Sequence, residues 1–421
     1  MLALIDATGM YASAEKVFDP TIRNKPVIVL SNNDGCIVAM CPIAKRLGKE
    51  LGISKFGPYF QVADKARKAG FVVKSSNYEL YADISQRMME TCESFGETHI
   101  YSIDECFMRF PDEYTKDYLE ELGHDLRKTI WRHVRLPVGV GFGPSLTLAK
   151  AANHASKKLP GATGVALIAT YNDRKHVLSQ MACDDVWGVG RRLAKRLDVM
   201  GIKNAWQLAE QPAKKIRKDF SILMENTVRE LKGEAYYQWD TVRPAKKEIY
   251  STRSFGKRVT CNIELKNALS GHGETASRKM REQNSLCAGM VIFAASSPHD
   301  NAPYFKKSVY HQFEVPTCDT RIILGAISAA LPQLYKSGTR YYKCGVGLVD
   351  LHDSQYQQQD LFAVSQDDPS LMKMLDSINS RYGRHTLQFA SRGIEQKFDM
   401  KREFLSKRAT TRWSDIPRVM C

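Results

Sequence analysis

The chain has 421 residues, 43% of them hydrophobic, which is too long for one compact core and suggests roughly two to four domains. No apolar run reaches the roughly 18 residues of a membrane span, and the start of the chain lacks the unbroken apolar core of a signal peptide. We therefore expect a soluble, cytoplasmic protein with no membrane partner. The net charge of +15 favours a polyanionic partner, and ten cysteines without a CxxC pair argue against a disulfide framework or zinc module.

The first half of the chain alternates between strand and helix patterns. Strands are expected at 1–6, 25–34 and 136–145, and helices at 42–52, 77–95 and 115–133. An acidic hairpin at 101–107 separates the last two helices and implies antiparallel pairing. We therefore expect an α/β or α+β domain built on a mixed sheet.

The second half changes character twice. Residues 172–233 are mostly helical, with short helices broken at glycines, and a polar, proline-containing stretch follows them. Between 243 and 351, strand patterns alternate with helical stretches at 265–284 and 319–337, as in a separate small α+β domain. The remainder, 352–421, opens with a glutamine-rich run and ends in a basic, poorly periodic segment.

The stretch YSIDECF at 101–107 places two acids, Asp104 and Glu105, among residues that favour a buried strand. A buried charge must be neutralised, unless the pair lies in a solvated hairpin turn. A tight turn would direct both acids to one site, and Asp6, which ends the first strand, could lie beside them. Because Mg²⁺ prefers oxygen ligands, two such ions are the natural counter-charge, and they suit phosphoryl or nucleotidyl transfer.

The stretch VWGVGRRLAKRL, which begins at Val186, fits a helix-hairpin-helix that binds DNA backbone without reading its sequence. Gly188 and Gly190 shape the hairpin, and exposed backbone N–H groups at the next helix start can hold a phosphate. Arg191 and Arg192 begin that helix and are expected to face outward. The alternative is an ordinary helix-turn-helix packing unit.

The strand at 250–259 is a second candidate for DNA binding. Alternation places Arg253, Phe255 and Lys257 on one side, so that Arg253 and Lys257 could follow a phosphate backbone. An edge strand protected by charge explains the same residues equally well.

The stretch QQDLF lies just beyond the last expected domain. Gln358, Leu361 and Phe362 fit the kind of peptide that docks on the bacterial sliding clamp. A chance match in a polar tail is the alternative.

Six stretches together resemble the Y-family translesion DNA polymerases, in particular the bacterial branch of the SOS response. They are SNNDGC, SSNYELYADIS, YSIDECF, DDVWGVGRRLAKRL, RSFGKRV and the terminal KREFLSKRATTRWSDIP, and the resemblance runs essentially from end to end. It implies an α+β multidomain right hand with a mixed-sheet palm, small fingers, a helical thumb and an α+β little finger, plus a C-terminal tail. The implied bounds are palm 1–11 and 79–171, fingers 12–78, thumb 172–233, linker 234–242, little finger 243–351 and tail 352–421.

The same resemblance assigns roles to single residues. Asp6, Asp104 and Glu105, with the Ala7 carbonyl, take the positions of the ligands of two Mg²⁺ ions. Tyr11 matches the steric gate that excludes a ribose 2'-OH. Lys157 and Lys45 match residues that meet the triphosphate, although many relatives have arginine at the position of Lys45.

Some residues depart from the family pattern and put nucleotide selection in doubt. Pro42 stands where many relatives have a phosphate-contacting tyrosine, Gly9 and Met10 replace an alanine and an aromatic residue, and Leu146 replaces a frequent lysine.

The resemblance implies an error-prone DNA polymerase that takes primer-template DNA and dNTP. It also implies that the protein works with a processed UmuD dimer and RecA, and is nucleoid-associated when bound to DNA. The alternatives are a metal-dependent phosphohydrolase or cyclase that uses the same acids, and a catalytically silent DNA-binding scaffold.

Overall fold

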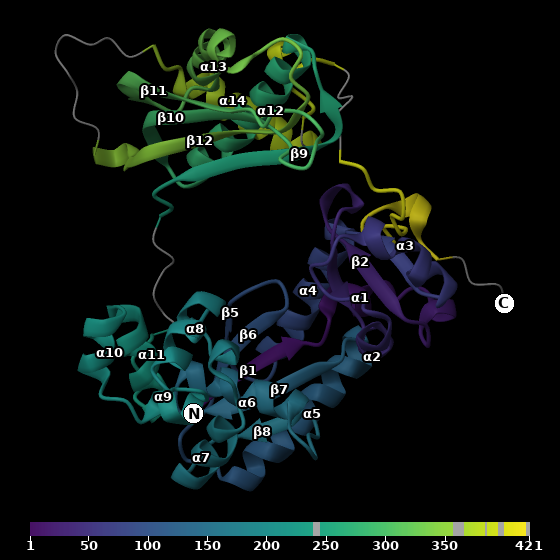
Figure 1. Ribbon diagram of the computed structural model, residues 1–421, viewed down its shortest axis with the longest axis vertical. Coiled ribbons are helices and arrows are strands. Elements are labelled where there is room, and N and C mark those ends of the chain that lie inside the picture. Colours follow the sequence, from purple (N-terminus) through teal and green to yellow (C-terminus); the bar gives the residue numbers. More distant parts are fainter. Residues whose placement is uncertain (239–244, 357–365, 384, 395–399, 418–421) are drawn as a thin grey trace. The chain divides into compact units, whose positions relative to one another are not determined.

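The computed structural model describes residues 1–238, 245–356, 366–383, 385–394 and 400–417 (Figure 1). Two compact units divide the chain: unit 1 comprises Met1–Thr241 with Arg402–Cys421, and unit 2 comprises Val242–Lys401. The expected linker 234–242 lies partly outside the described residues. Among the helices described here, none has the length and apolar character to span a membrane.

A five-stranded mixed sheet forms the centre of unit 1. Its order is β5-β6-β1-β7-β8, with bounds Glu97–Ile100, Glu105–Arg109, Leu2–Ala7, Val138–Gly143 and Val165–Leu167. The pair β7 and β8 is parallel, and the other neighbours are antiparallel. The mixed sheet and the hairpin predicted at 101–107 are therefore confirmed.

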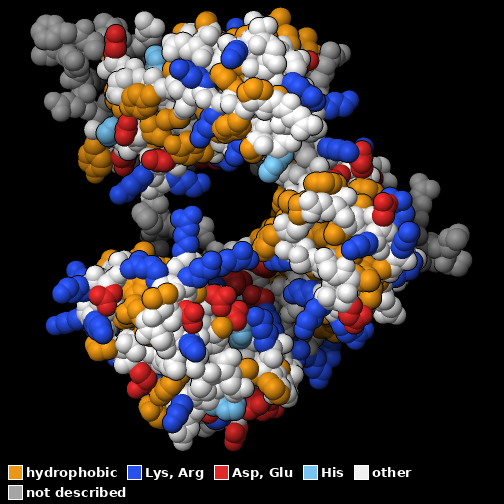
Figure 2. Space-filling model, in the orientation of Figure 1, with side chains coloured by type: hydrophobic (Ala, Val, Ile, Leu, Met, Phe, Trp, Pro, Cys, Tyr) orange, Lys and Arg blue, Asp and Glu red, His pale blue; other side chains and the backbone are white. Residues whose placement is uncertain are grey.

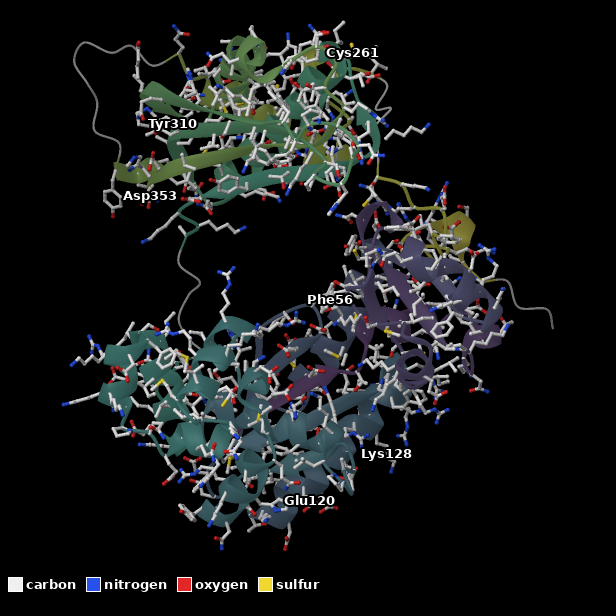
Figure 3. All side chains as sticks on the ribbon, in the orientation of Figure 1. Phe56, Glu120, Lys128, Cys261, Tyr310 and Asp353 are labelled. Atoms are coloured by element: carbon white, nitrogen blue, oxygen red, sulfur yellow. The ribbon has the colours of Figure 1, made fainter. Side chains whose placement is uncertain are left out.

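Helices α4 (Tyr78–Glu93) and α5 (Lys116–Val134) cover one face of this sheet. The inner side of α5 buries apolar residues such as Leu126, whereas Glu120 and Lys128 lie on its exposed side (Figure 3). The buried residues of α5 thus recur with the helical period of about 3.6 residues and form one apolar side.

Helix α6 (Leu146–Lys158) covers the opposite face, and glycines in β7 let it approach closely. A Cβ at Gly141 would overlap the backbone nitrogen of Asn153 and lie 2.5 Å from the Ala149 carbonyl oxygen. A Cβ at Gly143 would lie 2.7 Å from the Ala149 nitrogen. These glycines leave room for helix backbone where side chains would otherwise stand.

A smaller sheet in unit 1 has the order β3-β2-β4, with bounds Ile37–Met40, Val27–Leu30 and Val72–Ser75. Around it lie α1 (Met10–Glu15), α2 (Pro42–Leu51), α3 (Tyr59–Lys68), η1 (Pro20–Ile22) and η2 (Asn32–Asp34). Phe56, in the loop between α2 and α3, has a 67% exposed side chain (Figure 3). The predicted strand at 25–34 and helix at 42–52 are confirmed.

Five short helices and one 3-10 turn follow the central sheet in unit 1. They are α7 (Tyr171–Ser179), η3 (Cys183–Asp185), α8 (Arg191–Val199), α9 (Ala205–Ala209), α10 (Ala213–Asp219) and α11 (Ile222–Lys232). Their core is continuous with one side of α6, through residues such as Leu148 and Ala152. Helix α6 therefore belongs to two packing layers at once.

Unit 2 contains a four-stranded antiparallel sheet with the order β11-β10-β12-β9. The bounds are Lys306–Thr317, Ser285–Ser296, Tyr341–Asp353 and Ile249–Val259, with η4 at Ser354–Tyr356. Helices α12 (Asn262–Glu282) and α13 (Thr320–Leu334) pack on it (Figure 1). The sequence analysis did not identify β11, whose basic and aromatic residues obscure a simple alternation.

The segment after 365 is more ordered than its weak periodicity predicted. Helix α14 (Pro369–Tyr382) packs on unit 2, where Arg281 makes two hydrogen bonds of 2.7 and 2.8 Å to Asp376. The 3-10 turn η5 (Ala390–Arg392) follows it in unit 2, whereas η6 (Trp413–Asp415) belongs to unit 1. The chain end therefore contributes to both units.

The close approach of α6 predicts a strong response to one added methyl group. Gly141→Ala should cost about 3 kcal/mol or more of unfolding free energy, because the new Cβ meets helix backbone that cannot move aside. Gly325→Ala is the matched control: Gly325 lies on the exposed side of α13 with no atom within 4 Å of its added Cβ, and alanine there should stabilise by up to about 1 kcal/mol. Urea unfolding measures both, and equal effects would contradict this packing argument.

Candidate active site

The predicted acids meet at one edge of the central sheet. Asp6 on β1 and Glu105 on β6 are direct cross-strand partners. Asp104 precedes β6 in the hairpin turn, and its carbonyl oxygen accepts a 2.9 Å hydrogen bond from the Ala7 nitrogen. The turn closes through bonds of 3.1 and 3.0 Å from the nitrogens of Tyr101 and Ser102 to the Glu105 carbonyl. Asp104 and Glu105, which are adjacent in the sequence, therefore both lie beside the end of β1 that carries Asp6.

Two lysines and one hydroxyl hold these carboxylates. Lys157 forms an ion pair with Asp6, and Lys150 Nζ lies 2.8 Å from Glu105 Oε2. Ser102 Oγ donates a 2.7 Å hydrogen bond to Asp104 Oδ1. Burial raises the pKa of Glu105 and Asp6 raises it further, whereas Lys150 lowers it. The cationic side chains thus offset the cost of clustered negative charge.

Lys150 is a site residue that the sequence analysis missed. Its ammonium group lies 4.5, 5.3 and 5.7 Å from the ring centres of Tyr101, Trp187 and Phe107. These three rings surround the lysine and hold it beside Glu105. A signal was available, because Lys150 precedes Lys157 by two helical turns and so shares its side of α6.

Within the described ranges, no group of three His, Cys, Asp or Glu residues converges as a metal site. The donors nevertheless have the chemistry that Mg²⁺ requires, namely carboxylates and a backbone carbonyl. Lys157 and Lys150 neutralise the carboxylates of Asp6 and Glu105, and a bound divalent ion would neutralise the same carboxylates.

Tyr11 lies on α1, next to the acids. Its ring stacks on Tyr81 with centroids 4.5 Å apart and meets Tyr78 edge-on at 6.1 Å. Burial raises the pKa of Tyr11, and Tyr78 and Asp104 raise it further, which places the phenol in the field of the acidic cluster. The aromatic ring is thus held close to the acidic cluster.

The unusual residues before Tyr11 have structural reasons. Gly9 adopts φ 58°, and a Cβ there would lie 2.8 Å from the Met40 carbonyl oxygen, so only glycine fits. Met10 is a core residue with 3% exposure. Two further residues that differ from the family pattern also have structural reasons: Pro42 begins α2, and Leu146 is buried where α6 begins.

Lys45 lies on α2, with a side chain that is only partly exposed. Partial burial of its ammonium lowers its pKa, Lys55 and Lys157 lower it further, and Asp6 opposes them. Lys45 and Lys157 therefore lie close enough to share one electrostatic field. Two neighbouring cations beside an acidic cluster form a site that suits a triphosphate.

The predicted DNA-backbone hairpin lies between η3 and α8. Gly188 adopts φ 86°, and Gly190 caps α8 without a side-chain hydrogen bond. Arg191 and Arg192 are exposed on the first turn of α8. The first element of this motif is a 3-10 turn in place of the expected α-helix.

The other two binding candidates have different outcomes. In β9, Phe255 is buried against the helices, and Arg253 lines a cavity of about 320 Å³ with His272 of α12. By strand alternation, Arg253 and Lys257 share with Phe255 the face of the sheet that the helices cover. The clamp-binding prediction of Gln358, Leu361 and Phe362 lies outside the described residues.

Family models match three parts of the chain. Residues 5–154 match the impB/mucB/samB family, and 246–361 match the C-terminal domain of that family. Residues 369–419 match a domain described only as of unknown function. The relatives include the protein UmuC of Salmonella typhimurium, at 41% identity over 425 residues and 100% of both chains. DNA polymerase IV 2 of Bacillus subtilis is 24% identical over 397 residues, or 91% of this chain and 92% of its own.

Solved structures have the same fold. A Y-family DNA polymerase chimera built on Dbh matches with a TM-score of 0.65 at 17% identity, covering 83% of this chain and 98% of its own. The insertion ternary complex of Dbh DNA polymerase matches with a TM-score of 0.52 at 17% identity and the same coverage.

The ion pair between Lys150 and Glu105 leads to a prediction about metal dependence. Lys150→Met should cost roughly 1–3 kcal/mol of unfolding free energy, because Glu105 loses its cation while still facing Asp6. Added Mg²⁺ should raise the melting temperature of this variant more than that of the wild type. Lys158→Met is the control on the same helix, since its pair with Asp185 is exposed and should be worth less than about 1 kcal/mol. Equal losses of unfolding free energy in the two variants, or no added effect of Mg²⁺, would contradict the role of Lys150 in neutralising Glu105.

Proposed function

This chain belongs to the impB/mucB/samB family of Y-family DNA polymerases, and from that premise we infer that it performs translesion synthesis in the SOS response. It is an error-prone, DNA-directed DNA polymerase. The single observation that best supports the site is the cross-strand pairing of Asp6 with Glu105, next to Asp104. The two alternative functions, a phosphohydrolase or cyclase and a silent scaffold, gain no support from the relatives.

We propose that Asp6, Asp104 and Glu105, with the Ala7 carbonyl, hold two Mg²⁺ ions. Bound there, the ions would activate the primer 3'-OH and stabilise the charge on the α-phosphate of the dNTP. The protein contributes position and charge: the hairpin turn sets the acids side by side, and Lys150 and Lys157 limit their repulsion. Lys157 and Lys45 are proposed to bind the triphosphate.

Tyr11 is proposed as the steric gate of this site. Its ring is braced by Tyr81 and Tyr78 and lies in the field of Asp104. A ring fixed in this way leaves a nucleotide sugar no room for a 2'-OH, and rejection by overlap requires no hydrogen bond.

We propose domain bounds that assign each of the three sheets to a different domain, whereas the tail contributes to both units. The palm, 1–11 and 79–171, contains the five-stranded sheet, and the fingers, 12–78, contain the three-stranded sheet. The thumb, 172–233, contains the short helices, and the little finger, 243–351, contains the four-stranded sheet. The tail is 352–421.

Primer-template DNA is the proposed macromolecular substrate. Lys and Arg side chains are spread over the visible faces of both units (Figure 2), as suits a polyanion. We propose that Arg191 and Arg192, exposed in the first turn of α8, bind DNA phosphates together with the backbone N–H groups of that turn. A processed UmuD dimer, RecA and the sliding clamp are proposed as protein partners on the strength of the UmuC relationship.

The assignment of the acids is tested by primer extension on a template with a damaged base. Asp104→Asn should abolish incorporation and leave primer-template affinity nearly unchanged, because the amide removes a charged ligand without removing bulk. Asp125→Asn, on the exposed side of α5, should extend primers as the wild type does. Robust extension by Asp104→Asn would refute the metal-ligand role.

The gate is tested by single-nucleotide kinetics with matched dNTP and rNTP. Tyr11→Ala should raise the rNTP to dNTP ratio at least about tenfold, or roughly 1.4 kcal/mol of lost discrimination. Tyr11→Phe keeps the ring and should leave the ratio unchanged, because the rejection is steric. If Tyr11→Ala lowers the use of both nucleotides together, with a fall in melting temperature, Tyr11 is a core residue and the gate is elsewhere.

A further inference from the structure

Residues 402–408, here called the C-terminal strap, are bound to the small sheet of unit 1. The Phe404 carbonyl accepts a 3.0 Å hydrogen bond from the Ser75 nitrogen, and the Phe404 nitrogen donates one of 3.0 Å to Ser75 Oγ. The Glu403 nitrogen donates to Asp34 Oδ2 at 2.8 Å. In Figure 1 the yellow chain end lies beside α3, where the Phe404 ring meets Tyr59 edge-on at 6.2 Å.

The strap also binds the first turn of α4, the helix that carries Tyr81. Buried Asn77 caps this helix through the Leu80 nitrogen and donates a 2.9 Å hydrogen bond to Ser406 Oγ. Asn77 also donates to the backbone carbonyls of Ser406 and Lys407, at 3.3 Å each. The far end of the chain therefore fixes the orientation of the side chain that caps this helix.

Two arginines of the strap add charge to this contact. Arg402 and Arg408 lie 3.5 and 3.2 Å from the carboxylate of Glu79. Glu79 stands in the first turn of α4, so both pairs join the strap to the same helix end that Asn77 caps.

A chain of contacts leads from the strap to the proposed gate. Glu15, on α1, is only 4% exposed, and its Oε1 accepts hydrogen bonds from Tyr81 Oη at 2.6 Å and from Ser406 Oγ at 3.1 Å. The Tyr81 ring is fully buried and stacks on Tyr11 at an interplanar angle of 15°. Ser406 is thus two side chains away from the ring that stands in the nucleotide site.

The buried carboxylate makes this chain sensitive to the loss of one hydroxyl. Burial raises the pKa of Glu15, while Tyr81, Ser406 and Lys74 lower it. Without Ser406, a desolvated carboxylate keeps one of its two hydroxyl donors, and such a group turns toward other donors or water. A rotation of Glu15 away from Tyr81 removes the hydrogen bond to Tyr81 Oη, and the Tyr81 ring then loses one of the contacts that hold it against Tyr11.

We propose that the C-terminal strap, through Ser406, Glu15 and Tyr81, positions Tyr11 and so sets how strictly the polymerase rejects ribonucleotides. Ser406 is a positioning residue, since it acts through Glu15 and Tyr81 and does not meet the nucleotide. The strap lies in the stretch 369–419, which matches only a domain of unknown function, and this gives part of that stretch a role. The inference rests on the proposed gate at Tyr11.

The test compares three serine variants of the full chain by single-nucleotide kinetics with dNTP and rNTP. Ser406→Ala should raise the rNTP to dNTP ratio at least about threefold, and Ser406→Thr, which keeps the hydroxyl, should stay within about twofold of the wild type. Ser414→Ala is the matched control, because Ser414 is exposed and, among the described residues, its hydroxyl donates only to neighbouring Asp415, at 3.3 Å. Melting curves accompany all three.

A double variant separates positioning from a general structural effect. In a Tyr11→Ala background, Ser406→Ala should change the ratio by less than about twofold, since the ring that it positions is gone. Should Ser406→Ala fold poorly, Arg402→Ala combined with Arg408→Ala releases the strap from Glu79 without touching Glu15, and should raise the ratio in the same direction.

The outcomes distinguish the two proposals. If Tyr11→Ala itself leaves the ratio unchanged, the gate assignment fails and the strap inference falls with it. If Tyr11→Ala raises the ratio while Ser406→Ala and the double arginine variant leave it at the wild-type value, the gate stands and the strap inference is overturned. Equal loss of both nucleotide activities in Ser406→Ala also overturns it.

Discussion

Three carboxylates at adjoining strand ends repel one another, and the fold of unit 1 is built to tolerate this repulsion. Asp6 and Glu105 face each other across two central strands, and the turn adds Asp104. Lys157 and Lys150 neutralise two of them from a single helix, α6. That helix reaches the acids only because β7 presents glycine where it passes. A chemical requirement of the site is thus met by the packing of the sheet.

The same helix connects the site to the rest of unit 1. Lys150 is enclosed by aromatic rings, one of which, Trp187, comes from the hairpin that precedes α8. Leu148 and Ala152, on the other side of α6, are part of the core of the short helices. The charge balance of the acids and the packing of the proposed thumb therefore depend on one another. The proposed gate is held separately, by Tyr81 and the strap.

The sequence predicted most of what local pattern controls. The acidic hairpin, the first strand and helices α4 and α5 all follow from the hydrophobic pattern and the turn residues of their own segments. Contacts between distant segments could not be read in this way. The aromatic cage of Lys150 requires rings from two other segments, and the docking of Ser406 on Glu15 spans 391 positions. The sequence also predicted which residues of β9 share a face, but it did not predict which face the helices cover.

The central claim is that the acids which Lys150 and Lys157 hold are the ligands of two divalent ions during synthesis. Electron paramagnetic resonance can count bound Mn²⁺ in a complex of the chain with primer-template DNA and a non-hydrolysable dNTP. We expect two ions per chain, with at least one lost in Asp6→Asn combined with Glu105→Gln. An unchanged count in that variant, or no ion bound by the wild-type complex, would contradict the claim.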